Sequence, residues 1–181
     1  PPNDLAHQSS APSHAQRGAA MHTLLQYLPN IAFDERVTIG RRWLAARRYR
    51  TADAEPMLDE VFGVLDDPAF AALLAPGSMA EVPVMGTIMV AGEERGVSGV
   101  IDRLAITGDI VTVLDYKTAR SVPQTTAPTT AITQMALYGA LLAPLYPGKS
   151  LHTLVLYTAA PKIITVTPEQ RADALAALAK L

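Results

Sequence analysis

The fold is decided by residues 99–118, which read GVIDRLAITGDIVTVLDYKT. Two apolar, β-branched segments flank the TGDI sequence at residues 107–110, and Gly-Asp is typical of the central pair of a tight β-hairpin turn. In the register that such a turn sets, Asp102 lies opposite Asp115. Opposed residues share a face of the sheet. The sequence therefore predicts two carboxylates side by side in an otherwise apolar hairpin.

Two facing carboxylates repel each other, and a buried carboxylate is unfavourable unless it is paired or bound to a cation. Lys117 lies two positions beyond Asp115, so it points to the same face of the strand. A divalent cation between Asp102 and Asp115, with Lys117 beside it, suits metal-dependent phosphodiester hydrolysis. For either acid alone a simpler interpretation is open, because a single buried aspartate is commonly held by backbone N–H groups or by an arginine such as Arg103.

Two further motifs flank this hairpin. Residues 18–26 read GAAMHTLLQ and place His22 on an expected helix. Residues 134–138 read QMALY, so Gln134 and Tyr138 share one face of a later helix. Taken alone, His22 is compatible with a surface or core histidine, and the later helix with an amphipathic face that buries a phenol. The combination of the motifs, and their order, carries the functional argument.

The motifs together resemble those of the PD-(D/E)XK nucleases, and within them the RecB-like group. The similarity comprises G-x-x-x-H-x-L-L, G-x-x-D, D-Y-K-T and Q-x-x-x-Y over about residues 17–140. Within the group, the chain is most similar to the C-terminal nuclease domains of AddA-type helicase–nucleases. The resemblance implies a mixed α/β (α+β) domain with a restriction-endonuclease-like core. In such a core helices flank a central mixed sheet, here after an N-terminal helical segment.

The resemblance also implies roles for individual residues. The expected catalytic residues are Asp102, Asp115 and Lys117. The expected metal ligands are His22, Asp102, Asp115 and the backbone carbonyl of Tyr116, with Glu81 as a secondary candidate. The expected DNA contacts are Gln134, Tyr138, Thr118, Arg41 and Arg48. Two carboxylates and one imidazole are compatible with Mg²⁺, and the nitrogen ligand makes Mn²⁺ a natural substitute.

The two arginines in that set belong to an arginine-rich segment, residues 41–50, which we expect on one helix that ends near Tyr49. Arg41 and Arg48 are seven residues apart and would share a helix face. A solvated face, or a surface that docks onto the rest of a larger protein, explains them as well as DNA contact does.

The composition limits the possible functions. The 181 residues suit one domain, and a formal net charge of −2 gives no overall attraction to nucleic acid, so any DNA contact must be a local patch. The chain has no cysteine, which excludes disulfides and the cysteine-ligated iron–sulfur cluster of some RecB-like nucleases. The sequence shows no transmembrane run and no signal peptide, so we expect a cytoplasmic location.

The chain divides into two expected parts. Residues 1–16, rich in Pro, Ser and Ala, are predicted to form a flexible linker, and residues 17–181 the nuclease domain. Helices are expected over residues 17–28, 34–49, 53–65, 131–143 and 169–180. Strands are expected over residues 81–85, 87–90, 97–106, 110–116, 151–158 and 163–166, with a break at Gly86. The chain begins without Met and has no phosphate-binding loop, so we expect a domain excised from a larger helicase–nuclease.

The expected function is that of a Mg²⁺-dependent DNA exonuclease or nuclease domain. It would hydrolyse phosphodiester bonds of single-stranded DNA, unwound by helicase motor domains of the same polypeptide, during double-strand break repair and recombination. An AddB-like subunit would be its partner. One alternative is a catalytically silent DNA-binding or subunit-docking domain of the same fold. A small-molecule phosphoesterase is a third possibility, but it needs a closed pocket that the motifs do not suggest.

Overall fold

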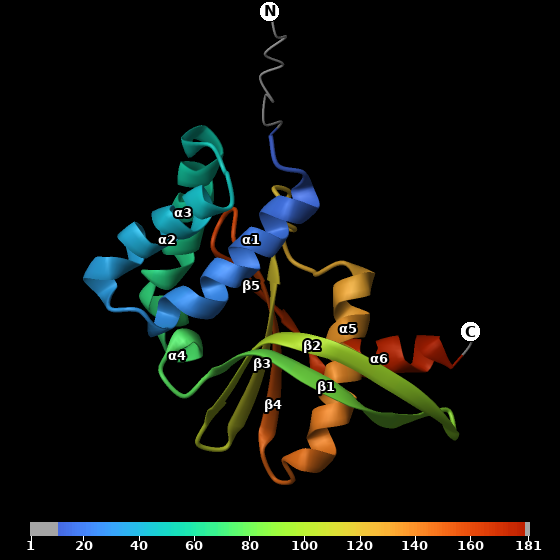
Figure 1. The fold of residues 1–181 in the computed structure, drawn as a ribbon. Helices are drawn as coiled ribbons and strands as arrows, with labels where there is room; N and C mark the ends of the chain where they lie inside the picture. Colours follow the sequence, from blue (N-terminus) through green and yellow to red (C-terminus); the bar gives the residue numbers. More distant parts are fainter. Residues whose placement is uncertain (1–10, 180–181) are drawn as a thin grey trace, which may run out of the picture.

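The computed structural model describes residues 11–179, which form a five-stranded mixed sheet with helices on both faces (Figure 1). The strands are β1 (Met79–Val90), β2 (Glu93–Thr107), β3 (Ile110–Lys117), β4 (Ser150–Tyr157) and β5 (Lys162–Val166). They lie in the order β1-β2-β3-β4-β5, and only β3 and β4 are parallel. A parallel pair needs a crossover connection, which the segment containing helix α5 (Thr129–Leu142) provides. The expected mixed α/β architecture is confirmed.

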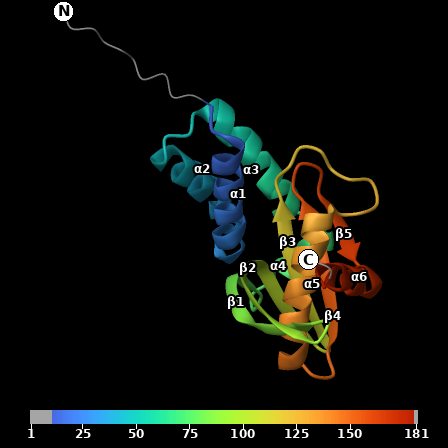
Figure 2. The same ribbon diagram turned by 90° about the vertical axis from the view of Figure 1, so that its right-hand side faces the viewer.

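The helices form two groups on opposite sides of the sheet (Figures 1 and 2). The first group contains α1 (His14–Tyr27), α2 (Arg36–Ala46), α3 (Thr51–Leu65) and the single turn α4 (Ala71–Leu74). The second contains α5 and α6 (Pro168–Leu178). Short 3-10 turns cover Leu28–Asn30, Phe33–Glu35, Pro68–Phe70 and Ala143–Leu145. No helix of the described chain is long and apolar enough to cross a membrane.

Helix α1 begins earlier than the sequence predicts. Ser13 caps it through a capping box, in which the Ser13 hydroxyl accepts the Gln16 N–H and the Gln16 side chain accepts the Ser13 N–H. Residues 14–16 of the expected linker are therefore helical. Residues 1–10 of that linker lie outside the described residues.

The expected break at Gly86 is wrong, because β1 continues through it. The side chain of Leu141 from α5 packs so closely there that a Cβ on residue 86 would lie 3.0 Å from its Cδ2 atom. Glycine at this position allows the helix to approach and does not end the strand. The chain instead reverses at Ala91-Gly92, where both residues have positive φ (52° and 84°), as a type I′ hairpin turn requires.

The predicted β2–β3 hairpin register is confirmed. Thr107 pairs with Ile110, and the ladder continues to the pair of Arg103 and Leu114. Gly108, the first of the two turn residues, has a φ of 55°, which is the backbone region that favours glycine. The turn identified from the sequence therefore sets which residues of the two strands face each other.

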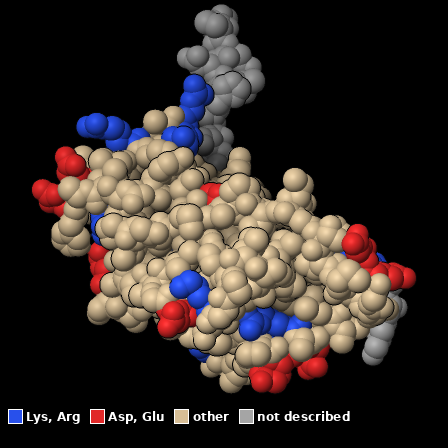
Figure 3. All heavy atoms as spheres, turned by 90° about the horizontal axis from the view of Figure 1, so that it is seen from below, with Lys and Arg blue, Asp and Glu red and all other residues tan. Residues whose placement is uncertain are grey.

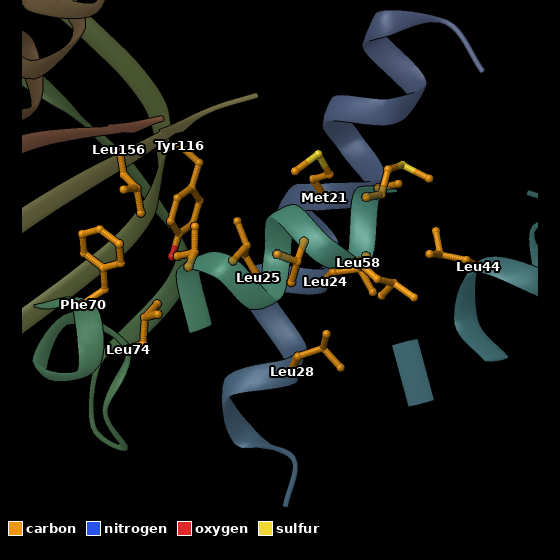
Figure 4. Close-up of a cluster of buried hydrophobic side chains, with 14 of the residues drawn as sticks. Met21, Leu24, Leu25, Leu28, Leu44, Leu58, Phe70, Leu74, Tyr116 and Leu156 are labelled. Atoms are coloured by element: carbon orange, nitrogen blue, oxygen red, sulfur yellow. The ribbon is translucent and has the colours of Figure 1, made fainter. Parts of the chain in front are cut away.

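Strand β3 separates two hydrophobic clusters. Leu114 and Tyr116 point towards α1, α3 and α4, where they join a cluster of leucines and methionines that includes Leu25 (Figure 4). Val111 and Val113 point the other way, into a cluster beneath α5. Successive residues of β3 thus alternate between two buried faces, as expected for a strand covered on both sides.

The arginine-rich segment does not form one helix. α2 ends at Ala46, and Arg47 and Arg48 lie in the turn to α3, where Arg48 has a φ of 63°. Arg41 and Arg48 therefore do not share a helix face, and the expectation that they do is wrong. A residue in the left-handed region cannot continue an α-helix, so the seven-residue spacing of Arg41 and Arg48 does not place them on one helix face.

Candidate active site

The candidate site lies where β2 separates from β3. The ladder between them ends at Arg103 and Leu114, and Asp102 is the next residue of β2. Its carboxylate Oδ2 accepts the backbone N–H of Tyr116 at 2.7 Å, in place of a backbone partner. Asp102 therefore occupies the gap between the two strands. The pair of Asp102 and Asp115, which the register places next, is not itself part of the ladder.

Three side chains from three elements converge at this gap. His22 of α1, Glu81 of β1 and Asp102 of β2 each place one possible ligand atom within 4.8 Å of the others. His22 Nδ1 lies 3.4 Å from Asp102 Oδ1, which is long for a hydrogen bond. Ligands at 2.0–2.1 Å from Mg²⁺ stand roughly 3 Å apart when adjacent and roughly 4 Å apart when opposite. We refer to His22, Glu81 and Asp102 as the metal group, because their spacing and donor chemistry fit a hard divalent cation.

The strand register explains how Glu81 reaches the group. β1 pairs with β2 through Ala80 with Arg103 and Val82 with Ile101, so Glu81 falls opposite Asp102. Glu81 has a φ of 51°, in a region that costs an L-residue other than glycine about 1–2 kcal/mol. This strained backbone lies at the one residue of β1 whose carboxylate joins the metal group. Such strain commonly accompanies functional sites.

The metal group concentrates negative charge around an imidazole. Burial lowers the pKa of His22, but the close contact with Asp102 and its charge, with the charges of Asp115 and Glu81, outweigh it and raise the pKa above 6.5. Burial and the charge of Asp102 raise the pKa of Glu81 above its usual value. A bound cation would favour the ionised form of each carboxylate.

Close packing holds α1, and with it His22, against the end of β3. A Cβ on Gly18 would lie 3.1 Å from Thr118 Oγ1, so the glycine permits the approach. Arg17 donates to the Thr118 carbonyl oxygen at 3.2 Å and forms an ion pair with Glu60 of α3. The G-x-x-x-H spacing therefore sets a helix contact at its glycine and a candidate ligand at its histidine.

Arg103 forms a second link between α1 and the sheet. Its guanidinium is buried and donates to the Leu25 carbonyl oxygen at 2.6 Å and to Ser78 Oγ at 3.2 Å. The simpler interpretation of Arg103, a counter-ion for Asp102, is not what the structure shows. Arg103 points to the helical face and fixes α1 beside the strand that carries Asp102.

The other two predicted catalytic residues lie towards α5. Lys117 Nζ is 2.7 Å from Asp115 Oδ2 and 3.5 Å from Gln134 Oε1. Burial raises the pKa of Asp115, whose side chain is only 6% exposed, and the charge of Lys117 opposes that increase. Asp115 lies outside the 4.8 Å metal group, although its charge acts on His22. We refer to Asp115 and Lys117 as the lysine pair.

Tyr138 supports this pair from within the fold. Its hydroxyl donates to the Val100 carbonyl oxygen at 2.9 Å and accepts from Gln134 Nε2 at 3.2 Å. A Cβ on Gly99 would lie 2.5 Å from the same hydroxyl, so glycine is required beside it. Tyr138 is buried and its hydroxyl is engaged, so it fixes Gln134, which in turn faces Lys117.

The backbone carbonyl of Tyr116 points to the β2 side of β3. The N–H and C=O of one strand residue point to the same side. The Tyr116 N–H reaches Asp102 on the β2 side, whereas the next carbonyl, that of Lys117, accepts the Thr158 N–H on the β4 side. The Tyr116 carbonyl therefore opens towards the gap that Asp102 occupies, where the resemblance places a ligand.

The remaining predicted DNA contacts are dispersed. Arg41 forms a two-pronged ion pair with Glu55, at 2.9 and 2.8 Å, and is not brought to the site. Arg48 lies in the α2–α3 turn, where it lines a hollow together with Gln16 of α1. Thr118 is at the end of β3 beside Gly18. Only Gln134 and Thr118 of the predicted set adjoin the lysine pair.

The mixed sheet, with carboxylates, an imidazole and a lysine near one another on β1, β2, α1 and β3, has the architecture of a nuclease domain. The chain belongs to the PD-(D/E)XK nuclease superfamily, whose family model matches residues 3–180. Members of this superfamily generally use Mg²⁺ and bind DNA, and the His22–Glu81–Asp102 group offers a place for such an ion.

One solved structure agrees with this fold. The chain resembles a candidate exonuclease from Eubacterium rectale, with a TM-score of 0.57 and 12% identity over 93% of this chain and 66% of that chain. This chain thus spans just under two thirds of that protein, and the low identity shows a shared fold alone. The protein SSO0001 is 17% identical over 88% of this chain and 72% of its own, but its TM-score of 0.42 carries no argument. No curated protein matches the sequence.

Proposed function

We propose that this domain is a Mg²⁺-dependent deoxyribonuclease that hydrolyses phosphodiester bonds of single-stranded DNA. One observation carries the proposal: Asp102 of the His22–Glu81–Asp102 group accepts the N–H of Tyr116, the residue between Asp115 and Lys117, and Asp115 and Gln134 contact Lys117. Family membership supplies the chemical class. The three-sided group and the fixed lysine together are what that class of chemistry requires.

In this proposal the chain's own residues divide the work. His22, Glu81 and Asp102 hold the cation, with the Tyr116 carbonyl and Asp115 as further ligands. The bound ion supplies Lewis-acid stabilisation of phosphate charge and a water of lowered pKa. Lys117 orients the attacking water and stabilises negative charge that develops on the phosphate. Gln134 and Tyr138 keep the ammonium group of Lys117 in position.

The finer assignment rests on the sequence motifs. We propose that the domain is of the AddA type, at the C-terminus of a helicase–nuclease that acts in double-strand break repair and recombination. Motor domains of the same polypeptide would deliver separated strands, and an AddB-like subunit would be the partner. The motif order G-x-x-x-H, G-x-x-D, D-Y-K-T and Q-x-x-x-Y supports this assignment.

The test is cleavage of end-labelled single-stranded DNA by the 181-residue chain with Mg²⁺ or Mn²⁺, beside EDTA and an Asp115→Ala control. We expect cleavage with either metal, none in EDTA and none with the variant. Metal affinity measured by calorimetry on the same samples separates ion binding from chemistry.

Two outcomes would redirect the proposal. Metal binding without cleavage would indicate a complete site that acts only with its motor or partner subunit. DNA binding with strong salt dependence and no metal affinity would indicate instead the catalytically silent binding or docking domain.

A further inference from the structure

Two surface hollows adjoin each other across α1. One is lined by Gly18, His22 and Glu81, so it opens directly onto the metal group. The other lies on the opposite side of the helix and is lined by Tyr27, Trp43 and other residues of α1 and α2. Both hollows share a wall, formed by Ala19, Thr23 and Gln26. Ala19 and Thr23 have small side chains, so the ridge between the hollows is low.

A third hollow extends this surface towards the α2–α3 turn. It shares Gln16, Arg47 and Tyr49 with the second hollow and adds Arg48 and Arg50. Gln16 and His22 are six residues apart on α1, which corresponds to about 9 Å along the helix. The three hollows therefore form one path that leads from the metal group to the arginine-rich turn.

The charges along the path favour an anionic strand. Within the described residues, neither Arg47 nor Arg48 forms an ion pair with an acid. Arg50 is paired with Asp53 at 2.7 Å, so its charge is largely compensated. Figure 3, a view from below, shows lysines and arginines in small separate groups and no continuous positive face, so a short local path is the form that DNA contact can take.

Aromatic side chains accompany these arginines. The Arg47 guanidinium lies 3.7 Å above the centre of the Trp43 ring, which holds its charge in place. Tyr27 is 58% exposed at the edge of the same hollow, so its ring is free to stack on a base. Cations that follow the backbone, combined with exposed aromatic rings, are the features with which proteins bind single strands.

We propose that this path, the α1 crossing, binds single-stranded DNA and guides it into the metal group. Arg47 and Arg48 contact phosphates, and Tyr27 stacks on a base before the strand passes over Ala19 and Thr23 to His22. The inference rests on the proposed nuclease function and assigns the route of its substrate. Arg41, which Glu55 already engages, takes no part.

The chain supplies its own reporter for this route. Trp43 is the only tryptophan, and it lies under Arg47. A 12-nucleotide single strand, titrated in EDTA so that no cleavage occurs, should change the Trp43 emission and saturate it. A blunt duplex of the same length should bind more weakly, since its paired bases cannot stack on Tyr27.

Variants locate the binding residues. Arg47→Ala/Arg48→Ala should weaken binding about tenfold and reduce the slope of log affinity against log salt by about 1.4, or about 0.7 for each phosphate that is no longer neutralised. Arg41→Ala/Arg95→Ala removes the same charge from two glutamate-paired arginines and should leave the slope unchanged. Tyr27→Ala should weaken binding about tenfold, whereas Tyr27→Phe should not.

An unchanged salt slope in Arg47→Ala/Arg48→Ala, or an unchanged Trp43 emission on binding, would overturn the route. Equal reductions of affinity in both double-arginine variants would do the same, because they would indicate a general charge effect. Cleavage in Mg²⁺ is measured separately. Cleavage without the expected binding signature would leave the nuclease proposal standing without this route, and the signature without cleavage would support the route alone.

Discussion

Where the β2–β3 ladder ends, carboxylates lie both towards α1 and towards α5, but their surroundings differ. On the α1 side, Glu81 and Asp102 form no ion pair with a lysine or arginine of the described chain, and one of them has a strained backbone. On the α5 side, Asp115 is paired with Lys117, which Gln134 also contacts. The α1 side, which we call the open side, can therefore bind a cation from solution. The α5 side, which we call the closed side, already contains the ammonium group of Lys117.

The largest expected effect comes from removing charge on the open side. Asp102→Asn should abolish metal binding and reduce cleavage about a thousandfold, because metal stabilisation amounts to several kcal/mol and each 1.36 kcal/mol is tenfold in rate. The amide oxygen can still accept the Tyr116 N–H, so thermal unfolding should change little. Calorimetric metal titration and single-turnover cleavage check this, and an unchanged metal affinity would contradict the ligand assignment.

Replacement of Lys117, on the α5 side, should change the cleavage rate and not the metal affinity. Lys117→Met should slow cleavage about a hundredfold through the loss of transition-state charge stabilisation. It should also destabilise the fold, because Asp115 is left buried without its partner. Adding Asp115→Asn should recover the stability but not the rate. Cleavage by Lys117→Met at the wild-type rate would show that the lysine pair is structural only.

At Glu81, the effect of the carboxylate on metal binding can be separated from the effect of the strained backbone on stability. Glu81→Gln keeps the strain and should weaken metal binding about tenfold. Glu81→Gly should weaken it similarly but raise the free energy of unfolding by about 1 kcal/mol relative to Glu81→Gln, because glycine accepts a φ of 51° without cost. Denaturant unfolding of both variants measures the difference. Equal stabilities would show that the backbone at residue 81 stores no strain.

The packing beneath the lysine pair should show a smaller and mainly structural effect. Gly99→Ala forces a methyl group against the Tyr138 hydroxyl and should destabilise the fold by about 1–3 kcal/mol. Tyr138→Phe removes two hydrogen bonds without crowding and should cost about 1 kcal/mol, with a severalfold loss of cleavage rate through Gln134. A large loss of DNA affinity in Tyr138→Phe would contradict the supporting role.

The smallest effect is expected at Arg41. Its partner Glu55 is on α3, and the pair is exposed, so Arg41→Ala should leave the thermal unfolding midpoint, the metal affinity and the DNA affinity unchanged. Fluorescence anisotropy with a labelled single strand checks the last of these. A loss of affinity comparable with that of Arg47→Ala/Arg48→Ala would return Arg41 to the DNA-binding set.

The sequence predicts the hairpin and the sheet class because those depend on local turn chemistry. Gly108-Asp109 fixes the β2–β3 pairing, and the structure follows it down to Arg103. Beyond that pair the strands separate, so alternation no longer says where Asp102 points. A two-residue period says nothing of where a ladder ends, because strands twist.

The pairing of Glu81 with Asp102 could have been predicted from the sequence. If the reversal is placed at Ala91-Gly92 and the strand is continued through Gly86, the register puts Glu81 directly opposite Asp102. A break of the strand at Gly86, as predicted from the sequence, hides this pairing. Gly86 accommodates a leucine of α5, a tertiary contact that nothing in the local sequence indicates.

The buried Arg103 couples assembly of the site to folding itself. Its guanidinium joins the strand next to Asp102 to the carbonyl of Leu25, one turn from His22. If α1 moved off the sheet, the buried Arg103 guanidinium would lose its hydrogen-bond partner on α1. A partly open state in which the helix and the strand separate is therefore high in free energy. The amide hydrogens of α1 and β2 should thus exchange with solvent together, as one cooperative unit. A molecule in which this unit unfolds would then lose the candidate active site as a whole and would not retain a misaligned one.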